Sequence, residues 1–284
     1  MRVTVIVCLF SDSRYYVNRL PLMRRQWISL KNQIDTDFDV IAVDNLSGDD
    51  VFGLCKKYFP NAKTLVCPLP KYVSGARFLG VMAAQTSHVV LLDSDLILYP
   101  TFIDNYKKFF SKFPESVGEG IVYDYPDKVF LGNEFIENGG INYLSLVDGA
   151  KLFSSAAHSL PSSLWYTNHS EDEYKVYDAK NNFRCQNLGL PRDLYLDLGK
   201  HDVDMIGYGC EDGMFGARIV FYKKDCRLIK NVSCIHQCHR KKEDQSHKED
   251  VVDAKKNNQV CVKKIKEMIR GRESEFKNRM PFIQ

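Results

Sequence analysis

Short apolar runs alternate with segments of helical periodicity over the first hundred residues. The runs at 1–10, 38–43, 64–67 and 89–98 are rich in β-branched residues and leucine, a pattern typical of strands buried on both faces. Between them, apolar residues recur at spacings of three and four, which predicts a helix after each of the first three strands. Alternating strands and helices predict an α/β protein with a parallel sheet of right-handed βαβ units.

The pattern changes after the fourth run. Pro100 predicts the start of another helix, and residues 117–183 predict a few strands and a long loop because they lack a regular period. The tail from about residue 248 predicts a charged helix in which Lys and Arg outnumber Asp and Glu. A solvated helical face is the usual meaning of such a run, and the alternative is a basic surface that contacts an anionic membrane.

Composition excludes several classes of protein. With 284 residues, of which 44% are hydrophobic and 26% charged, the chain is long enough for a full core in one domain or two packed lobes. A net charge of +3 argues against a dedicated nucleic-acid binder. Nine cysteines without paired spacing, no signal-peptide pattern and no run long enough to span a bilayer predict a cytoplasmic protein with reduced thiols.

Two carboxylates, Asp93 and Asp95, interrupt the apolar run at 89–98. Charges are costly inside a buried strand unless a metal or a partner charge compensates for lost solvation. Side chains alternate along a strand, so both carboxylates are expected on one side of its carboxyl end, where open α/β sheets bind ligands. The alternative is an Asp-rich turn, and D-x-D is too common a tripeptide to decide between them.

Neighbouring motifs favour a ligand site. Val43-Asp44-Asn45-Leu46-Ser47 follows the second strand, and Ser74-Gly75-Ala76-Arg77-Phe78-Leu79-Gly80, with Ser74 as expected cap, opens the third helix. Together with Leu91-Leu92-Asp93-Ser94-Asp95, their order and spacing over residues 3–98 resemble GT-A glycosyltransferases of the nucleotide-sugar-dependent family 2 and its relatives. Phe78 departs from that pattern, in which asparagine is usual. The resemblance implies a Rossmann-like, mostly parallel sheet flanked by helices.

Two later segments extend the resemblance. Residues 186–195 resemble the segment that precedes the acceptor site in these enzymes, and residues 206–215 resemble the G-W-G-x-E-D motif of β-1,4-galactosyltransferases and bacterial chondroitin polymerase, with Tyr208 in place of tryptophan. Glycines there would let the backbone pass close to a ligand, and an acidic pair suits the start of a helix. The alternative, a simple acidic N-cap, is disfavoured by the position of the pair downstream of D-x-D.

A last candidate stretch contains His236-Gln237. The pair resembles the H-Q that closes the metal site in chondroitin-polymerase-like enzymes, with His239 as the alternative ligand. Cys234, His236 and Cys238 alternate along the chain, but their spacing is too cramped for a tetrahedral structural zinc site.

The resemblance implies a metal-dependent, inverting transfer of sugar from a UDP-sugar to a glycan or lipid-linked saccharide, as in polysaccharide biosynthesis. It implies a catalytic base at Asp212 and acceptor contacts from Glu211, Asn187 and Tyr208. The nucleotide-sugar site is expected to contain Phe10, Ser11, Asp44, Asn45, Arg77, Asp93, Ser94 and Asp95. Asp95 and His236 are the expected metal ligands, with Asp93 and His239 as alternatives. A carboxylate, imidazole and phosphate shell suits Mn²⁺ better than Mg²⁺.

The expected organisation is a GT-A domain over 1–247 and a basic, helical tail over 248–284. Within the domain, 1–98 form the nucleotide-sugar half and 99–247 the acceptor half. Two other functions stay open. A non-catalytic nucleotide-sugar- or carbohydrate-binding protein would not explain Asp93, Asp95, Asp212 and His236 together. A sugar-1-phosphate nucleotidyltransferase would need a glycine-rich, basic loop after the first strand, and Phe10-Ser11-Asp12-Ser13-Arg14 is not one.

Overall fold

A computed structural model describes residues 1–13, 18–68, 72–125, 174–176, 183–237 and 245–271. The described strands are β1 (Val3–Leu9), β2 (Phe38–Asp44), β3 (Lys63–Val66), β4 (His88–Asp93), β5 (Leu96–Leu98), β6 (Val117–Tyr125), β7 (Tyr174–Val176), β8 (Asn187–Pro191) and β9 (Cys226–Gln237). The described helices are α1 (Leu20–Lys31), α2 (Val51–Tyr58), α3 (Val73–Ala83), α4 (Phe102–Lys112), α8 (Arg192–Asp197), α9 (Glu211–Phe221) and α10 (Gln245–Ile269).

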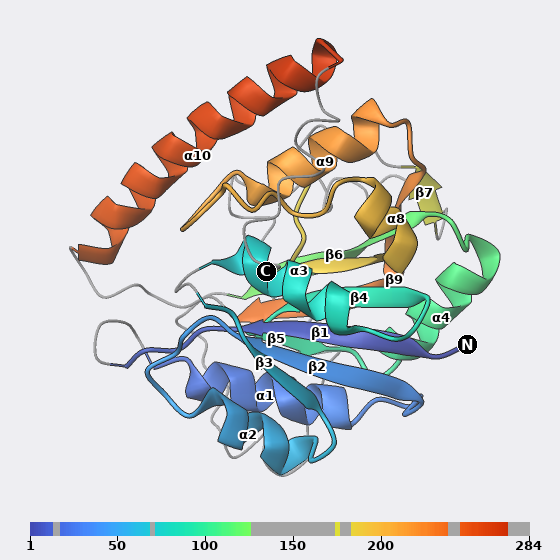
Figure 1. The fold of residues 1–284 in the computed structure, drawn as a ribbon. Helices are drawn as coiled ribbons and strands as arrows, with labels where there is room; N and C mark the ends of the chain where they lie inside the picture. The colour runs from blue at the N-terminus through green and yellow to red at the C-terminus, as the bar shows by residue number, and fades with distance from the viewer. Residues whose placement is uncertain (14–17, 69–71, 126–173, 177–182, 238–244, 272–284) are drawn as a thin grey trace.

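The described strands form one mixed sheet in the order β3-β2-β1-β4-β8-β6-β9-β5, with β7 also paired to β9 (Figure 1). β3, β2, β1 and β4 are parallel, as the βαβ pattern predicts. β8 then pairs antiparallel with both β4 and β6, while β6 and β9 run parallel. The predicted α/β class and helix-flanked sheet are confirmed, and the antiparallel pairs involve β5 and the later strands.

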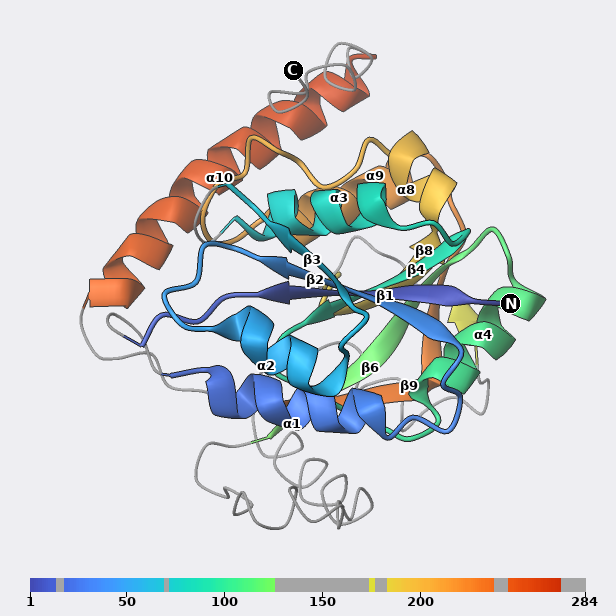
Figure 2. The same ribbon diagram turned by 60° about the horizontal axis from the view of Figure 1, so that its bottom comes forward.

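Helices cover both faces of the sheet, with α1 and α2 on one face and α3, α8 and α9 on the other (Figure 2). The alternation of side chains along β1 divides the core accordingly. Val5 and Val7 pack with the α1 and α4 side, where Trp27 is buried, whereas Ile6 packs with the α3 and α9 side, where Phe215 is buried.

The run at 89–98 is not a single strand. β4 pairs with β1 as far as Asp93, and residues 94–95 form a turn that redirects the chain into β5, which pairs antiparallel with β9. The expectation that Asp93 and Asp95 share one strand is therefore wrong, and both the strand and the turn suggested by the sequence are present. The turn sends the two carboxylates to different partners.

Helix α3 also differs from its expected start. It begins at Val73 with Tyr72 as its N-cap, and Ser74 is fully buried within the helix instead of capping it. Gly80 explains how closely this helix packs, because a Cβ there would lie 2.3 Å from Cγ2 of Ile6 on β1. Close packing against β1 holds Arg77, one turn earlier, next to the carboxyl end of the sheet.

The C-terminal segment forms the expected helix. α10 begins at Gln245, so the expected boundary between 247 and 248 falls inside it, and it contacts α9. Among the described residues, no helix is both long and apolar enough to cross a membrane. The eight cysteines described are free thiols, as expected for a chain without disulfides.

Candidate active site

The carboxyl ends of β1, β2 and β4 meet at one edge of the sheet and bring the expected donor-side residues together. Asn45 follows β2, and its backbone N–H donates to the carbonyl of Leu9 at the end of β1 over 2.9 Å. The Ser11 backbone N–H donates to Oγ of Ser47, and Oδ1 of Asp44 accepts from the Ser47 N–H, both over 3.0 Å. The first two loops are thus bonded to each other, as a site at this edge requires.

Several polar atoms around this edge are buried without a hydrogen-bond partner in the described part of the chain. They are Asn45 Oδ1, Ser74 Oγ, Arg77 Nε, Gln186 Oε1 and Glu211 Oε2. Buried polar atoms in native proteins nearly always have a partner, which can be water or a ligand. Their concentration in the segments at this edge fits a site that binds a polar ligand.

Arg77 lies at the centre of the site. Its guanidinium is 2% exposed and forms two ion pairs: Nη2 lies 3.0 Å from Oδ1 of Asp93 and Nη1 lies 2.6 Å from Oδ1 of Asp212. One buried cation therefore joins the D-x-D motif to the acidic pair at the start of α9. These two motifs are more than a hundred residues apart in the chain.

Charge and burial oppose each other here. Burial alone would lower the pKa of Arg77, but the Asp212 and Asp93 carboxylates outweigh it and hold that pKa well above its ordinary value. Burial also raises the pKa of Asp93, and the nearby Arg77 charge only partly offsets this. Breaking such a buried pair from one side leaves an uncompensated charge, so Arg77 and its two carboxylates act as a unit.

The expected metal ligands also meet. Leu96 on β5 is in register with His236 on β9, which places Nε2 of His236 3.6 Å from Oδ2 of Asp95. One carboxylate and one imidazole at this separation fit two ligands of a single divalent ion. Asp93 is turned to Arg77 instead, and His239 lies outside the described residues.

A second group of possible metal ligands lies on the other side of Arg77. Donor atoms of Cys185, His201 and Asp212 are all within 4.8 Å of one another. Nη1 of Arg77 already lies 2.6 Å from Asp212 and 3.5 Å from Nε2 of His201, so a metal ion would meet a fixed positive charge. Burial, Arg77 and Arg218 hold the pKa of His201 well below its usual value, so its ring is neutral. The neutral ring could bind a metal, but the fixed Arg77 charge opposes a cation at this second group.

Two carboxyls near Asp212 are unusually basic. Burial and the neighbouring Asp212 charge raise the pKa of Glu211 to about 7. Burial is also the main reason that the pKa of Glu119, on β6, rises to about 8. The start of α9 thus combines an ion-paired carboxylate, Asp212, with a proton-holding neighbour, Glu211.

The remaining predicted residues have different surroundings. Tyr208 is 59% exposed in the loop before α9, where its ring is accessible. Phe10 is half-buried after β1, and Ser94 is buried in the turn between Asp93 and Asp95. Asn187 is fully buried, and its amide bonds to Oη of Tyr106 and the carbonyl of Val232 inside the sheet, so the acceptor contact expected of it finds no support.

Sequence reasoning missed the polar residues that support the D-x-D turn. Gln26 on α1 donates to the Asp93 carbonyl over 2.7 Å. The Gln237 side chain accepts from Arg25 over 3.0 Å and donates to the Asp95 carbonyl over 3.2 Å. Arg25 and Gln26 are polar residues at buried positions of a helix that the sequence identifies by its apolar spacing. Polar residues on the buried side of that helix are the only signal for this role.

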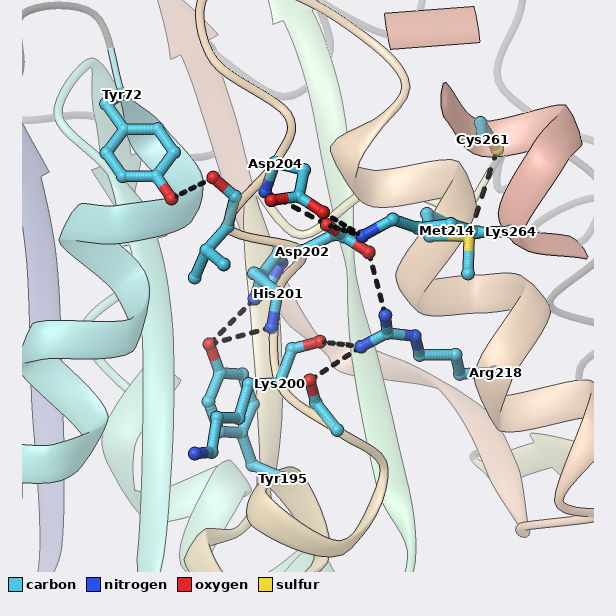
Figure 3. Close-up of polar contacts among 12 residues, drawn as sticks. Tyr72, Tyr195, Lys200, His201, Asp202, Asp204, Met214, Arg218, Cys261 and Lys264 are labelled. Atoms are coloured by element: carbon cyan, nitrogen blue, oxygen red, sulfur yellow. Dashed lines mark hydrogen bonds and ion pairs between the residues drawn. The ribbon is translucent and has the colours of Figure 1, made fainter. Parts of the chain in front are cut away.

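A second missed group surrounds the segment before the acidic pair. Asp202 is buried between Nη2 of Arg218 at 2.8 Å and Nζ of Lys264 at 2.6 Å (Figure 3). Tyr72 on α3 donates to the carbonyl of Val203 (Figure 3). Three helices, α3, α9 and α10, therefore hold one short segment beside the site.

Residues 16–149 match the family model of "Glycosyl transferase family 2". The match ends before the acidic pair, but it covers Arg77 and both aspartates of D-x-D. The segment that contains β2, β3, β4 and the D-x-D turn is thus similar to family 2 glycosyltransferases. No curated protein sequence matches it.

Solved structures have the same GT-A fold. S. aureus TarS is 14% identical with a TM-score of 0.57, and the likeness covers 84% of this chain and 37% of TarS. The structure of TarS 1–349 in complex with UDP has the same sequence identity to this chain and the same TM-score, and the likeness covers 61% of it. The mannosyltransferase PcManGT from Pyrobaculum calidifontis, in complex with GDP-Man and Mn²⁺, is 16% identical with a TM-score of 0.55; the likeness covers 84% of this chain and 57% of PcManGT. The chain therefore spans only part of the length of these proteins.

The raised pKa of Glu211 predicts a pH-dependent stability difference. Between its ordinary value of 4.5 and about 7, the folded state binds this proton more tightly than the unfolded state, so the free energy of unfolding falls as pH rises. Glu211→Gln cannot ionise at this position, so it avoids the loss of stability at high pH. The variant should be more stable than the unmodified protein by about 1–3 kcal/mol at pH 8 but not at pH 4.5. Thermal unfolding from pH 4.5 to 8, with exposed Glu115→Gln as control, measures the difference. A stability gap that does not change with pH would contradict it.

Proposed function

We propose that this protein is a metal-dependent, inverting glycosyltransferase that moves a sugar from a UDP-sugar to a saccharide acceptor. The observation that carries the proposal is the Arg77 bridge, because it puts the D-x-D motif and the Glu211–Asp212 pair on the same buried cation. A nucleotide-binding protein without catalysis would need the first motif but not the second.

The donor is proposed to bind at the carboxyl ends of β1, β2 and β4. Unpartnered buried atoms at Asn45, Ser74 and Arg77 supply polar groups for a nucleotide, and Asp44 and Ser11 line the same edge. TarS 1–349 has been solved with UDP and with UDP-GlcNAc, and PcManGT with GDP-Man. Other proteins of this fold therefore bind nucleotide-sugars. We assign a UDP-sugar as the donor class.

Asp95 and His236 are proposed to hold one divalent ion, for which Mn²⁺ fits the mixed oxygen and nitrogen donors. PcManGT has been solved with Mn²⁺. When bound, the ion would neutralise negative charge on the diphosphate leaving group. Gln237, Arg25 and Gln26 keep the backbone of the turn in place around Asp95.

Asp212 is proposed as the general base. In the reaction the acceptor hydroxyl oxygen bonds to the anomeric carbon, and the bond from that carbon to the diphosphate oxygen breaks with its electron pair leaving on UDP. The hydroxyl proton passes to the Asp212 carboxylate. Arg77 holds this carboxylate in one orientation through their 2.6 Å ion pair, and Glu211 and Tyr208 are proposed to contact the acceptor.

The exposed face of α10 is proposed as a contact for an anionic membrane that carries a lipid-linked acceptor. Among the side chains that the structure describes, five exposed cations lie along the helix or directly after it, accompanied by the exposed apolar residues Val252, Val262 and Ile269. The cations are Lys255, Lys256, Lys263, Lys266 and Arg270. Interleaved cations and apolar side chains are typical of helices that lie in a membrane interface.

Metal dependence is the first test. Hydrolysis of a panel of UDP-sugars should stop in EDTA and resume with Mn²⁺, and Asp95→Asn should lose Mn²⁺-dependent UDP binding while staying folded. His236→Ala should resemble Asp95→Asn, and His239→Ala should not. Full activity in EDTA would refute the metal site, and equal mild effects of the two histidine changes would exclude both as ligands.

Asp212→Asn keeps the size of the side chain and removes the base. Its kcat should fall by about a hundredfold to ten-thousandfold, the usual contribution of a general base. Its UDP affinity should change little, because Asp95 and His236 remain, and Glu211→Gln should mainly raise the acceptor KM. Steady-state kinetics with varied acceptor separates the two effects. A near-normal kcat in Asp212→Asn would rule out its role as base.

Membrane contact is tested by co-sedimentation with vesicles. The protein should bind vesicles that contain phosphatidylglycerol, release at high salt and ignore pure phosphatidylcholine, because the attraction is electrostatic. Replacing Lys255, Lys263 and Lys266 by Gln should weaken binding, whereas Lys57→Gln on α2 should not. Binding that is independent of lipid charge, or no binding, would contradict the contact.

A further inference from the structure

The loop before α9 sets the position of the acidic pair, and two of its side chains are largely exposed. Ile206 and Tyr208 are 53% and 59% exposed. Cys210, the N-cap of α9, has a left-handed backbone with φ of 70° and makes no side-chain cap bond. Contacts with another part of the chain would help to keep the first turn of α9, with Glu211 and Asp212, in place.

Asn257 on α10 supplies that restraint. It is 3% exposed, and its Nδ2 donates to the carbonyl oxygens of Ile206, Tyr208 and Gly209 over 3.2, 3.2 and 3.0 Å. An amide nitrogen carries two hydrogens, so three acceptors must share them. A single side chain thus gathers three carbonyls of the loop to one point on α10.

The two glycines of the loop make this approach feasible. Gly207 and Gly209 have φ of +83° and +95°, a region that favours glycine. A Cβ at Gly207 would lie 2.2 Å from Oδ2 of Asp253, and one at Gly209 would lie 3.3 Å from Cβ of Ala254. The glycines were expected to let the backbone pass close to a ligand, but the atoms closest to them belong to Asp253 and Ala254 of α10.

Other contacts hold α10 independently of Asn257. Nζ of Lys264 lies 2.6 Å from carboxylate oxygens of both Asp202 and Asp204, and Asp202 is also paired with Arg218 (Figure 3). An apolar cluster joins Cys261 and Met268 of α10 to Met214 of α9 and to Met205, which precedes the loop. Because these anchors lie toward the end of α10, removing the Asn257 amide should free the loop without releasing the helix.

We propose that Asn257 is a positioning residue for the sugar-transfer reaction: it holds the 206–209 loop so that Glu211 and Asp212 meet Arg77 and the acceptor. This inference rests on the proposed function. It adds α10, which lies outside the family 2 match, to the machinery of the site. A displacement of about 1 Å at a catalytic group can cost about a hundredfold in rate, so a local loop restraint has a kinetic signature.

The test compares Asn257→Ala, which removes the amide, and Asn257→Asp, which keeps its size but replaces donors with an acceptor beside three carbonyls. Adjacent, exposed Asn258→Ala is the matched control. UDP-glucose, UDP-galactose and UDP-N-acetylglucosamine are screened with the unmodified protein, and the sugar-nucleotide that it turns over is used for all variants below their unfolding temperatures. Binding of UDP with Mn²⁺ is measured in parallel by calorimetry.

Asn257→Ala should lower kcat at least tenfold with UDP affinity within twofold of normal, Asn257→Asp should lower kcat further, and Asn258→Ala should match the unmodified protein. A normal kcat in folded Asn257→Ala would overturn the proposal. Loss of the whole fold in Asn257→Ala would also overturn it, because the residue would then stabilise the protein generally. If the unmodified protein turns over no sugar-nucleotide, the proposed function fails instead. Hydrogen exchange of the backbone amides of residues 206–212 then tests the restraint by Asn257 separately. Unchanged exchange in Asn257→Ala would refute that restraint.

Discussion

The buried guanidinium of Arg77 is the interaction on which the site depends. It lies between Asp93, at the end of β4, and Asp212, at the start of α9, with a separate ion pair to each. An isolated charge in this position would be prohibitively costly, so the two carboxylates and the arginine must be placed together when the chain folds. Every element that fixes one of them, including the close packing of α3 on β1 at Gly80, therefore shapes the site.

The surroundings of Arg77 divide the site into two sides with different chemistry. On one side, Asp95 and His236 offer a carboxylate oxygen and an imidazole nitrogen 3.6 Å apart, which suits a metal and a diphosphate. On the other side, Glu211 has a raised pKa and Asp212 is ion-paired, which suits proton transfer from an acceptor. α10 supports that second side through Asn257 and Lys264.

Local patterns predicted much of this arrangement. Apolar runs and helical spacing placed Asp44 and Asp93 at the ends of parallel strands of one sheet, and the fold followed from the same signals. The Arg77–Asp212 pair could not be derived from spacing, since it joins residues far apart in the chain. The sequence could not decide between a turn at Ser94 and a continuous strand. The aspartates favour a turn, but apolar residues continue on both sides of it. Lys264 was counted with a solvated tail, although it is buried on Asp202; charge composition does not reveal which cation of a helix faces inward.

The location of the metal and the nucleotide tests the account most directly. A crystal of the protein with UDP and Mn²⁺, measured for anomalous scattering from manganese, gives both positions in one experiment. We expect a manganese peak bonded to Asp95 and His236, with the diphosphate of UDP on that ion and Arg77 still paired with Asp212. A peak among Cys185, His201 and Asp212, or UDP bound away from the ends of β1, β2 and β4, would contradict the account.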